Sequence, residues 1–378
     1  MRFHSLRLKN FRNYRDLTLE FPPGIVVFCG ENGQGKTNLV EAFHFLLRGE
    51  SFRPATVETL LRHEESGHAP SGLIEGRLSQ KTLQHDLKLT LNERGRGVMW
   101  NNHRTNSAAL ARAFPLVLFS PESLAAIKEG PEQRRRLLDD VVLTHSQSSV
   151  KILKDFKHAL KTRNRVLKDT LKGKLAREPA RHLLESLDAS YLPLATELTV
   201  ARLNALTALQ TDFQKAISYV LDRSDVDIAV EYLISGQNAA TWSRSDILSA
   251  MHNRGLELRE RELGVGASLV GPQRHDIRIL FAGKDSRFFC SQGQQRALVL
   301  SFKMAQILYH YRSYQVYPFL LLDDVLSELD PIRRTNLVKF LRDIPAQIFL
   351  TTTDLSFSLD FGDRRLNVFR IENGTVSS

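Results

Sequence analysis

Residues 25 to 37 read Ile25-Val26-Val27-Phe28-Cys29-Gly30-Glu31-Asn32-Gly33-Gln34-Gly35-Lys36-Thr37, and the architecture expected for the whole chain follows from them. The last eight match the phosphate-binding loop G-x-x-x-x-G-K-[ST], between an apolar strand and a helical pattern. In such a loop backbone N–H groups face phosphate oxygens, Lys36 reaches the β- and γ-phosphates, and the Thr37 hydroxyl ligates Mg²⁺. A chance match is the alternative, but it leaves the flanking strand and helix unexplained. The sequence therefore predicts a nucleoside triphosphate bound by residues 30 to 37 and Asn38.

A second motif of the same site lies far downstream, where the apolar run Phe319-Leu320-Leu321-Leu322 ends in Asp323 and Asp324. This pattern is typical of a Walker B strand, in which the first carboxylate holds Mg²⁺ and the second orients and deprotonates the attacking water. We therefore predict Thr37 and Asp323 as magnesium ligands, and Lys36 and Asp324 as catalytic residues. An ordinary buried strand that ends in a polar turn is the alternative, and the phosphate loop upstream argues against it.

A third segment predicts how the site is completed. Ser291-Gln292-Gly293-Gln294-Gln295 opens a helix whose apolar positions recur at helical spacing, so Ser291 is expected to be its N-cap. The helix N-terminus, the Gly293 backbone and the serine hydroxyl form a second anion site, to which we also assign Gln294. Because one chain rarely needs two such sites, we expect this one to cap the γ-phosphate held by a second copy. The protein would then be an ATP-dependent homodimer.

These motifs resemble those of the ABC ATPase superfamily, with Ser291 to Gln295 as its signature motif and Ser327-Glu328-Leu329-Asp330-Pro331 as its D-loop. Asp330 is expected to cap the next helix and Pro331 to occupy its first position. The flanking segments resemble the RecF family of bacterial DNA repair proteins, itself similar to the heads of SMC proteins. These segments span the chain from end to end: Leu8-Lys9-Asn10-Phe11-Arg12-Asn13-Tyr14, Ser51-Phe52-Arg53, Phe119-Ser120-Pro121-Glu122, residues 130 to 139 and Gly271-Pro272-Gln273-Arg274.

The resemblance implies an ATP-dependent dimer that binds single-stranded, gapped or junction DNA and assists recombinase loading, replication-fork maintenance and SOS induction. It also implies RecR-type mediator proteins as partners. The family usually has Gly-Pro-His-Arg-Asp-Asp where residues 271 to 276 of this chain read Gly-Pro-Gln-Arg-His-Asp. We therefore assign no role to Gln273, Arg274 or His275. Arg12 is expected near the nucleotide only by analogy, and the sequence does not place it.

The fold class implied is α/β: an ABC-type, SMC-like P-loop ATPase head with a mixed-sheet lobe I and an inserted, mainly helical lobe II, without a long coiled coil. We place lobe I, with the Walker motifs and the D-loop, at residues 1–118 and 313–378. Lobe II, with a basic helix and the signature motif, takes residues 119–312. The apolar patterns predict strands near 3–8, 17–21, 73–78, 85–91 and 348–352, helices near 146–174 and 181–221, a hairpin at 271–289 and a turn at 373–374.

Composition indicates an ordinary globular protein that can bury a large core, since 42% of its 378 residues are hydrophobic. No apolar stretch approaches the ~18 residues of a membrane span, and residues 1 to 10 carry charges without an apolar core segment. We therefore expect a cytoplasmic protein without a membrane partner. Cys29 and Cys290 have no nearby cysteine or paired histidines, which predicts neither a disulfide framework nor a zinc site.

The net charge of +10 is concentrated in residues 151 to 181, where eleven Lys and Arg face three acidic residues. Six of these bases advance by three or four positions and form one stripe on a helix: Lys154, Lys157, Lys161, Arg165, Lys168 and Lys172. Such a stripe attracts the DNA backbone without reading bases. An ordinary solvated helix face would look similar, and the resemblance to DNA-binding ATPase heads favours DNA.

The resemblance also predicts a weak, DNA-stimulated ATPase. Asp324 is one methylene shorter than the usual catalytic Glu, residues 351 to 354 contain no switch His, and residues 119 to 122 contain no Q-loop Gln. Slow turnover suits a timer, in which hydrolysis releases a closed dimer from DNA. The main alternative is the ATPase subunit of a membrane transporter, against which the missing Gln and the basic helical insertion argue. A structural head that binds ATP without cleaving it is a further alternative, against which Asp324 argues.

Overall fold

The computed structural model describes residues 1–62, 71–93, 95–145, 147–356 and 361–377, which form two compact units. Unit 1 comprises residues 1–125, 215–224 and 296–378, and unit 2 comprises residues 126–214 and 225–295. The first sheet of unit 1 is antiparallel, in the order β2-β1-β4-β5-β6-β7. Its strands are β1 (Arg2–Phe11), β2 (Tyr14–Glu20), β4 (Gly72–Gln80), β5 (Leu83–Asn92), β6 (Gly95–Trp100) and β7 (His103–Arg104).

The second sheet of unit 1 carries the predicted motifs. Its order is β16-β15-β3-β14-β13-β8, and every pairing is parallel except that of β16. The strands are β3 (Ile25–Cys29), β8 (Leu116–Phe119), β13 (Phe319–Leu322), β14 (Ile348–Thr352), β15 (Leu366–Glu372) and β16 (Thr375–Ser377). Since parallel strands end at the same edge, the segments after β3, β13 and β14 meet there. Unit 1 thus contains an antiparallel sheet and a mixed, mostly parallel sheet.

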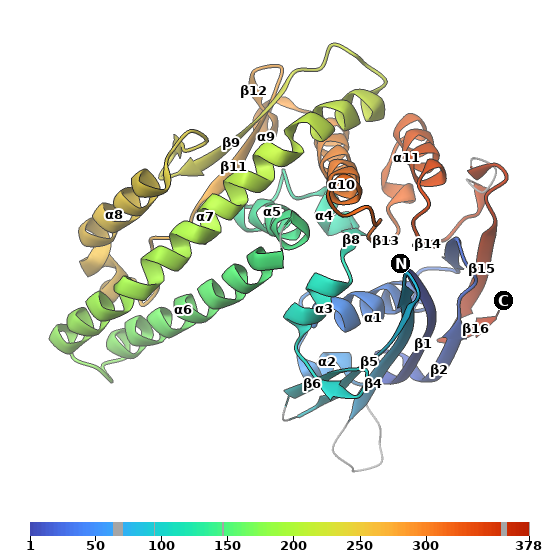
Figure 1. Cartoon of the computed structure of the whole chain (residues 1–378), viewed down its shortest axis with the longest axis horizontal. Helices are drawn as coiled ribbons and strands as arrows, with labels where there is room; N and C mark the ends of the chain where they lie inside the picture. Colours follow the sequence, from blue (N-terminus) through green and yellow to red (C-terminus); the bar gives the residue numbers. More distant parts are fainter. Residues whose placement is uncertain (63–70, 94, 146, 357–360, 378) are drawn as a thin grey trace. The chain divides into compact units, whose positions relative to one another are not determined.

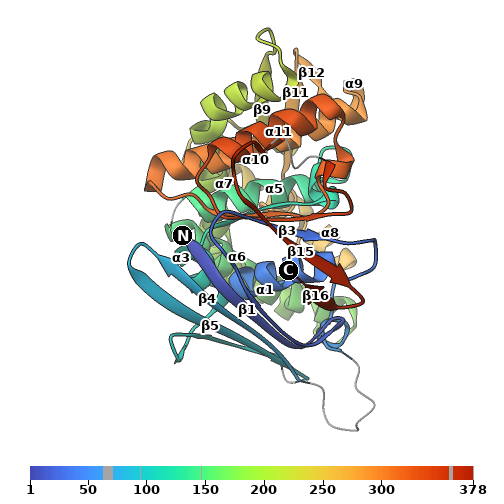
Figure 2. The same cartoon turned by 90° about the vertical axis from the view of Figure 1, so that its right-hand side faces the viewer.

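Helix α1 (Lys36–Arg48) packs between the two sheets of unit 1 (Figures 1 and 2). Phe43 of α1 lies 5.0 Å from Phe3 of β1 and 4.2 Å from Phe349 of β14, between ring centroids. All three rings are buried, and each contributes about 1.5–3 kcal/mol by leaving water. The helix that begins at Lys36 is therefore fixed by both sheets. Unit 1 also contains the short helices α2 (Val57–Leu60), α3 (Ser107–Ala113), α4 (Pro121–Leu124) and η1 (Leu326–Glu328), and α11 (Pro331–Asp343), which is as long as α1.

Unit 2 is built on long helices. These are α5 (Pro131–His145), α6 (Gln147–Leu171), most of α7 (Arg177–Leu221) and α8 (Arg244–Val265). The buried Arg163 of α6 joins three of them, because its guanidinium donates to Asp188 of α7 at 2.8 Å and to Glu262 of α8 at 2.7 Å. Helix α7 has 45 residues and begins at Arg177, before the expected residue 181, so it extends about 68 Å. Of the helices described, none is long and apolar enough to cross a membrane.

A four-stranded antiparallel sheet accompanies these helices in the order β10-β9-β11-β12. Its strands are β9 (Ile228–Ile234), β10 (Gln237–Asn238), β11 (Asp276–Phe281) and β12 (Lys284–Asp285). The hairpin expected within residues 271–289 is present as β11 and β12, but its second half turns into the short helix α9 (Ser286–Phe289). The cause is Asp285, whose side chain accepts a hydrogen bond from the Arg287 N–H and caps that turn.

The compact units are divided differently from the predicted lobes. Helix α10 (Gln292–Tyr314) belongs to unit 1 from Arg296 onward, whereas lobe I was expected to resume only at residue 313. Packing explains the difference, because Arg296 bonds to Glu328 and the Lys303 ammonium lies over the Phe119 ring, all within unit 1. The functional division into lobes stays a prediction. The predicted helix over 146–174 corresponds to α6, apart from residue 146, which lies outside the described residues.

Candidate nucleotide site

The phosphate loop leaves β3 and enters α1 through two glycines that no other residue could replace without strain. A Cβ at Gly30 would lie 2.3 Å from the Ile371 carbonyl oxygen, because the loop runs directly against β15. Gly35 has φ +113°, and a Cβ there would lie 2.4 Å from the Asn13 side chain. The glycines thus let the loop bend between strand and helix in the form that cradles phosphates.

Lys36 lies at the start of α1, where its ammonium donates to the carbonyl oxygens of Gly30 (2.5 Å) and Glu31 (2.7 Å). Burial lowers its pKa, and the nearby carboxylates of Asp324 and Asp323 oppose that change. The Lys36 side chain therefore folds over the phosphate loop, and its ammonium group points at the loop backbone. This is the position from which a lysine can contact β- and γ-phosphate oxygens.

Two oxygen ligands of the predicted magnesium site are brought together from distant segments. The Thr37 hydroxyl donates to the buried Asp323 carboxylate at 2.9 Å, and the same carboxylate oxygen accepts the Thr351 hydroxyl at 2.9 Å. Hydroxyl and carboxylate oxygens are the ligands Mg²⁺ prefers, with the remaining positions filled by water and phosphate. The residues therefore fit Mg²⁺, although no cluster of three or more acidic, His or Cys ligands occurs in the described part of the chain. Burial raises the pKa of Asp323, and the two hydroxyls oppose that change.

Asp324 follows in an unusual conformation. Its φ is +49°, in the left-handed region, and its N–H donates to the Thr351 hydroxyl at 2.8 Å. Its carboxylate, like that of Asp323, raises the pKa of Lys36 against the effect of burial. Thr351, noted in the sequence only because a switch His was missing there, thus connects both acidic residues. The sequence could have indicated this role, because Thr351 lies at the end of β14, the strand between β3 and β13.

The back of the loop is held by residues from both ends of the chain. Asn13, in the β1–β2 turn, donates to the Gln34 carbonyl at 3.2 Å and accepts from the Asn38 amide at 2.8 Å. Gly374, in the β15–β16 turn, donates to the same Gln34 carbonyl at 3.2 Å. Asn373 precedes it and has φ +48°, so the expected 373–374 turn is present. Sequence reasoning did not predict that this turn would support the phosphate loop.

A buried carboxylate on α1, that of Glu41, binds several side chains next to the phosphate loop. Glu41, fully buried, accepts hydrogen bonds from Arg12 (2.7 and 2.8 Å), Arg53 (2.6 Å) and Ser51 (2.5 Å). Burial alone would raise its pKa, but the hydrogen bonds from Arg12, Ser51 and Arg53 and the charge of Arg53 lower it. Arg53 also donates to Asn38 at 2.9 Å, which connects this cluster to the loop. Arg12 therefore lies against α1, and Glu41 was missed because a lone Glu in an apolar helix gives no motif.

The signature segment lies in unit 2. The Ser291 hydroxyl accepts the Gln294 N–H at 3.2 Å, and the Gln294 side chain accepts the Ser291 N–H at 2.8 Å, which is a reciprocal capping box. Ser291 is thus the predicted N-cap of α10, and it is exposed. The buried Gln295 amide donates to the carbonyls of Ser286, Arg287 and Cys290. The nucleotide-binding roles of Ser291, Gly293 and Gln294 stay predictions.

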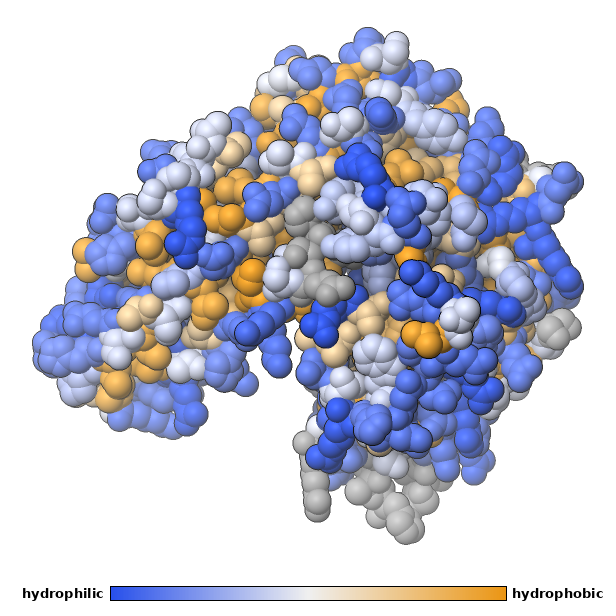
Figure 3. Space-filling model, viewed as in Figure 1, coloured by the Kyte–Doolittle hydropathy of each residue, from blue (hydrophilic) through white to orange (hydrophobic). Residues whose placement is uncertain are grey.

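The six bases of the predicted stripe are all exposed on α6 or just after its end. Leu153, Phe156 and Leu167 form the buried face beside them, whereas Leu171 is exposed at the end of the helix. Figure 3 shows hydrophilic residues gathered over the end of unit 2 where α6 and α7 meet. The stripe is therefore available to a polyanion, and its contact with DNA stays a prediction.

The comparisons with known proteins identify relatives over the whole chain. Residues 2–377 match the family model described as the RecF/RecN/SMC N terminal domain. The DNA replication and repair protein RecF of Heliobacterium modesticaldum is 34% identical over 378 residues, which cover 100% of this chain and 99% of that protein. The protein of the same name from Geobacillus thermodenitrificans is 32% identical over 375 residues, covering 99% and 98%.

Solved structures agree with the sequence relatives. The structure of the recombination mediator protein RecF with ATP in the RecFOR pathway superposes with a TM-score of 0.84 at 28% identity, covering 100% of this chain and 97% of that one. An SMC head domain from Pyrococcus furiosus matches with a TM-score of 0.55 at 16% identity, covering 100% and 96%, and shows the fold alone. The expected SMC-like ABC ATPase head is confirmed. The transporter alternative is not supported, since the full-length relatives are DNA replication and repair proteins.

Proposed function

Because the chain belongs to the RecF family of DNA replication and repair proteins, we propose that it binds ATP with Mg²⁺, closes as a homodimer on DNA and is released by slow hydrolysis. The observation that carries this proposal is the convergence of the phosphate loop, Thr37 and Asp323 at one edge of the parallel sheet. A relative of the same fold is described with ATP in the RecFOR pathway. Recombinational repair, with recombinase loading, fork maintenance and SOS induction, is the corresponding process.

The residues of this chain divide the work of hydrolysis. Lys36 and the loop N–H groups orient the triphosphate, Thr37 and Asp323 would hold Mg²⁺, and Asp324 would position and deprotonate water. Mg²⁺ supplies charge neutralisation on the β- and γ-phosphate oxygens when it is bound. Asp324 has a short side chain, and its backbone N–H is held by the Thr351 hydroxyl, so its carboxylate reaches less far toward a water than that of a Glu would. Slow, DNA-stimulated turnover follows, and Ser291, Gly293 and Gln294 of the second copy complete the site.

The exposed stripe on α6 is the proposed DNA contact. A row of lysines and arginines without a specific base-reading pattern binds phosphates, and its affinity falls steeply as salt rises. Single-stranded, gapped and junction DNA all present such phosphates. A RecR-type mediator is the proposed protein partner, supported by the RecFOR pathway that describes the related structure. The cytoplasm is the compartment in which these partners would meet.

The proposal is tested by the molecular mass in solution, measured by light scattering with Mg²⁺ and ATP, with and without a gapped duplex. The wild type should change from a 43.0 kDa monomer to a dimer with ATP, more completely with DNA. The Lys36→Met variant should remain monomeric, because it loses charge-assisted contacts to phosphate, and its ATP affinity should fall about hundredfold. A wild-type mass that never responds to ATP would reject the dimer.

A further inference from the structure

Two phenylalanines stand exposed directly before the signature motif. Phe288 and Phe289 are 76% and 67% exposed, the largest exposures among the large hydrophobic side chains of the described residues. A phenylalanine exposes roughly 150–250 Å² that it can bury in a contact. Adjacent exposed aromatic rings of this kind mark an interaction surface more often than a lone exposed residue does.

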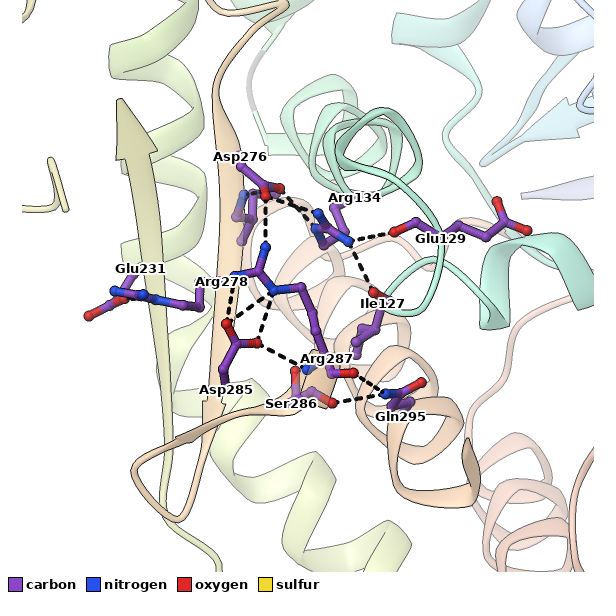
Figure 4. A network of polar contacts seen from close by, with 11 residues as sticks. Ile127, Glu129, Arg134, Glu231, Asp276, Arg278, Asp285, Ser286, Arg287 and Gln295 are labelled. Carbon is purple, nitrogen blue, oxygen red and sulfur yellow. Dashed lines mark hydrogen bonds and ion pairs between the residues drawn. The ribbon is translucent and has the colours of Figure 1, made fainter. Parts of the chain in front are cut away.

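The turn that carries the rings is held in place by the residues that precede them. Figure 4 shows Arg287, which precedes Phe288 in the chain, held by Asp285 and Asp276, while Asp276 is itself held by Arg134. Arg287 donates to Asp285 at 2.5 Å and to Asp276 at 3.2 Å, and Arg134 donates to Asp276 at 2.8 and 2.9 Å. Ser286 is buried, and its carbonyl accepts the Gln295 amide at 2.9 Å. The two phenylalanines are therefore displayed on a pre-organised support.

The rings lie close to Ser291 by chain connectivity alone. Phe288 and Phe289 precede Ser291 by three and two residues, so at ~3.8 Å per residue their Cα atoms lie within about 12 Å of it. The backbone of both phenylalanines therefore lies within about 12 Å of the exposed Ser291. Two phenylalanine rings supply a substantial part of the ~800 Å² that each partner buries in a stable interface.

The charges around the rings suit a surface that carries a bound triphosphate. The Lys284 ammonium lies 5.6 Å from the centre of the Phe289 ring, and the Arg287 guanidinium lies 5.3 Å from that of Phe288. The charge of Arg287 is already balanced by Asp285 and Asp276, so Arg287 chiefly orients its ring. An apolar pair with the Lys284 ammonium at its edge fits a protein surface next to phosphate oxygens.

Resting on the proposed function, we propose that Phe288 and Phe289 form an apolar contact with a second copy of this chain in the ATP-closed dimer, beside the Ser291 site. The contact accounts for the exposure of the rings, for their pre-organised support and for their position next to the signature motif. It supplies binding energy that is independent of the nucleotide contacts. It therefore affects closure of the dimer without affecting ATP binding by the monomer.

The test compares dimerisation of full-length variants with Mg²⁺ and ATP by sedimentation velocity, without DNA. In the Phe288→Ser/Phe289→Ser variant the dimer dissociation constant should rise at least about 30-fold, as for loss of an interface hot spot, while monomer affinity for a fluorescent ATP analogue stays within about twofold. Leu256→Ser is the matched control, because Leu256 is 60% exposed in the same unit but far from the motif in sequence, and it should dimerise normally. A thermal melt of each variant checks that it is folded.

The outcomes separate this contact from the proposed dimer itself. If the wild type stays monomeric with ATP, the sandwich proposal fails and the aromatic contact with it. If the wild type dimerises and Ser291→Arg does not, but the double phenylalanine variant dimerises as tightly as the wild type, only the aromatic contact is overturned. Normal dimerisation combined with lost binding of a labelled single-stranded oligonucleotide would instead make the pair a base-stacking surface.

Discussion

The phosphate-loop region and the signature region both present backbone N–H groups at a helix start, but they are built in opposite ways. The loop at Lys36 is held by contacts from the β1–β2 turn, the β15–β16 turn and the ends of β13 and β14. The signature segment is held mainly by near neighbours, through the Ser291–Gln294 capping box and the bonds of Gln295 to residues 286 to 290. Lys36 and Asp323 of the first region are buried, although Glu31, Asn32 and Gly33 at the tip of the loop are exposed, whereas the second region exposes Ser291 and Gln292 and buries only the anchoring Gln295.

This difference fits the two tasks. A site that holds a triphosphate in its own chain needs ligands fixed to a fraction of an ångström, which many long-range contacts provide. A site that meets a second copy must remain accessible before closure, and local capping keeps it in shape without covering it. We therefore expect a substitution in the first region to affect both stability and ligand binding, and a substitution in the second region to affect only its immediate surroundings.

The largest effect is expected from Glu41→Ala. It leaves Arg12 and Arg53 without their shared buried carboxylate, which should lower the free energy of unfolding by about 3 kcal/mol, since both arginines retain some exposure. ATP affinity should fall as well, because Arg53 also holds Asn38. Denaturant titration and equilibrium ATP binding measure the two effects.

The control for Glu41 is an ion pair of the helical unit at the surface. Glu132 and Arg136 are 67% and 61% exposed, so Glu132→Ala should cost less than about 1 kcal/mol. The folded-state pKa of Glu41 lies below its ordinary value, so its stabilisation is present above about pH 4.5 and is lost as the pH falls. Equal losses of stability in the two variants would contradict the contrast between the regions.

The next effect concerns Thr351, which contacts both acidic residues of the Walker B strand. Thr351→Val keeps the volume but removes the hydroxyl, so Asp323 loses one of its two hydroxyl partners. Apparent Mg²⁺ affinity in the presence of ATP should fall about 10–100-fold, as is usual for partners of a metal ligand. Thr351→Ser retains the hydroxyl and should restore most of the affinity. A magnesium titration of ATPase activity that is unchanged in the valine variant would rule out this role.

The same contrast explains what the sequence could predict. The loop, the Walker B strand, the Ser291 and Asp330 caps and the exposed α6 stripe are written in contiguous residues or fixed periods, and the structure has each of them. Glu41, Asn13 and Gly374 act only through partners far away in the sequence, and no spacing rule indicates such pairings. Strand β9 was not predicted, since Glu231 interrupts its apolar residues, and Arg163 counted as one more base although it is buried among α6, α7 and α8.

A smaller effect is expected from His275, a buried histidine of the helical unit. Burial and the charges of Arg202 and Arg135 lower its pKa to about 3, so it is neutral in the folded protein. The unfolded chain binds a proton near pH 6.5, so stability is full above that pH and decreases as the pH falls toward 3, at up to ~1.4 kcal/mol per pH unit. In the His275→Asn variant the decrease in the free energy of unfolding from pH 7 to pH 5 should be smaller by about 1–2 kcal/mol. An identical pH dependence in both proteins would show that His275 is accessible to protons when folded.

The smallest effect is expected from Ser291→Ala, and it is the sharpest test of a locally built region. The change removes the hydroxyl that accepts the Gln294 N–H, so α10 loses its N-cap and the unfolding free energy should fall by about 1 kcal/mol. Ser291→Asn, also a good cap residue, should restore most of that stability. Because the phosphate loop is supported elsewhere, ATP affinity of the monomer should be unchanged in both variants, which a fluorescent nucleotide titration measures. A change in that affinity would mean that the two regions are coupled within one chain, and the contrast between them would not hold.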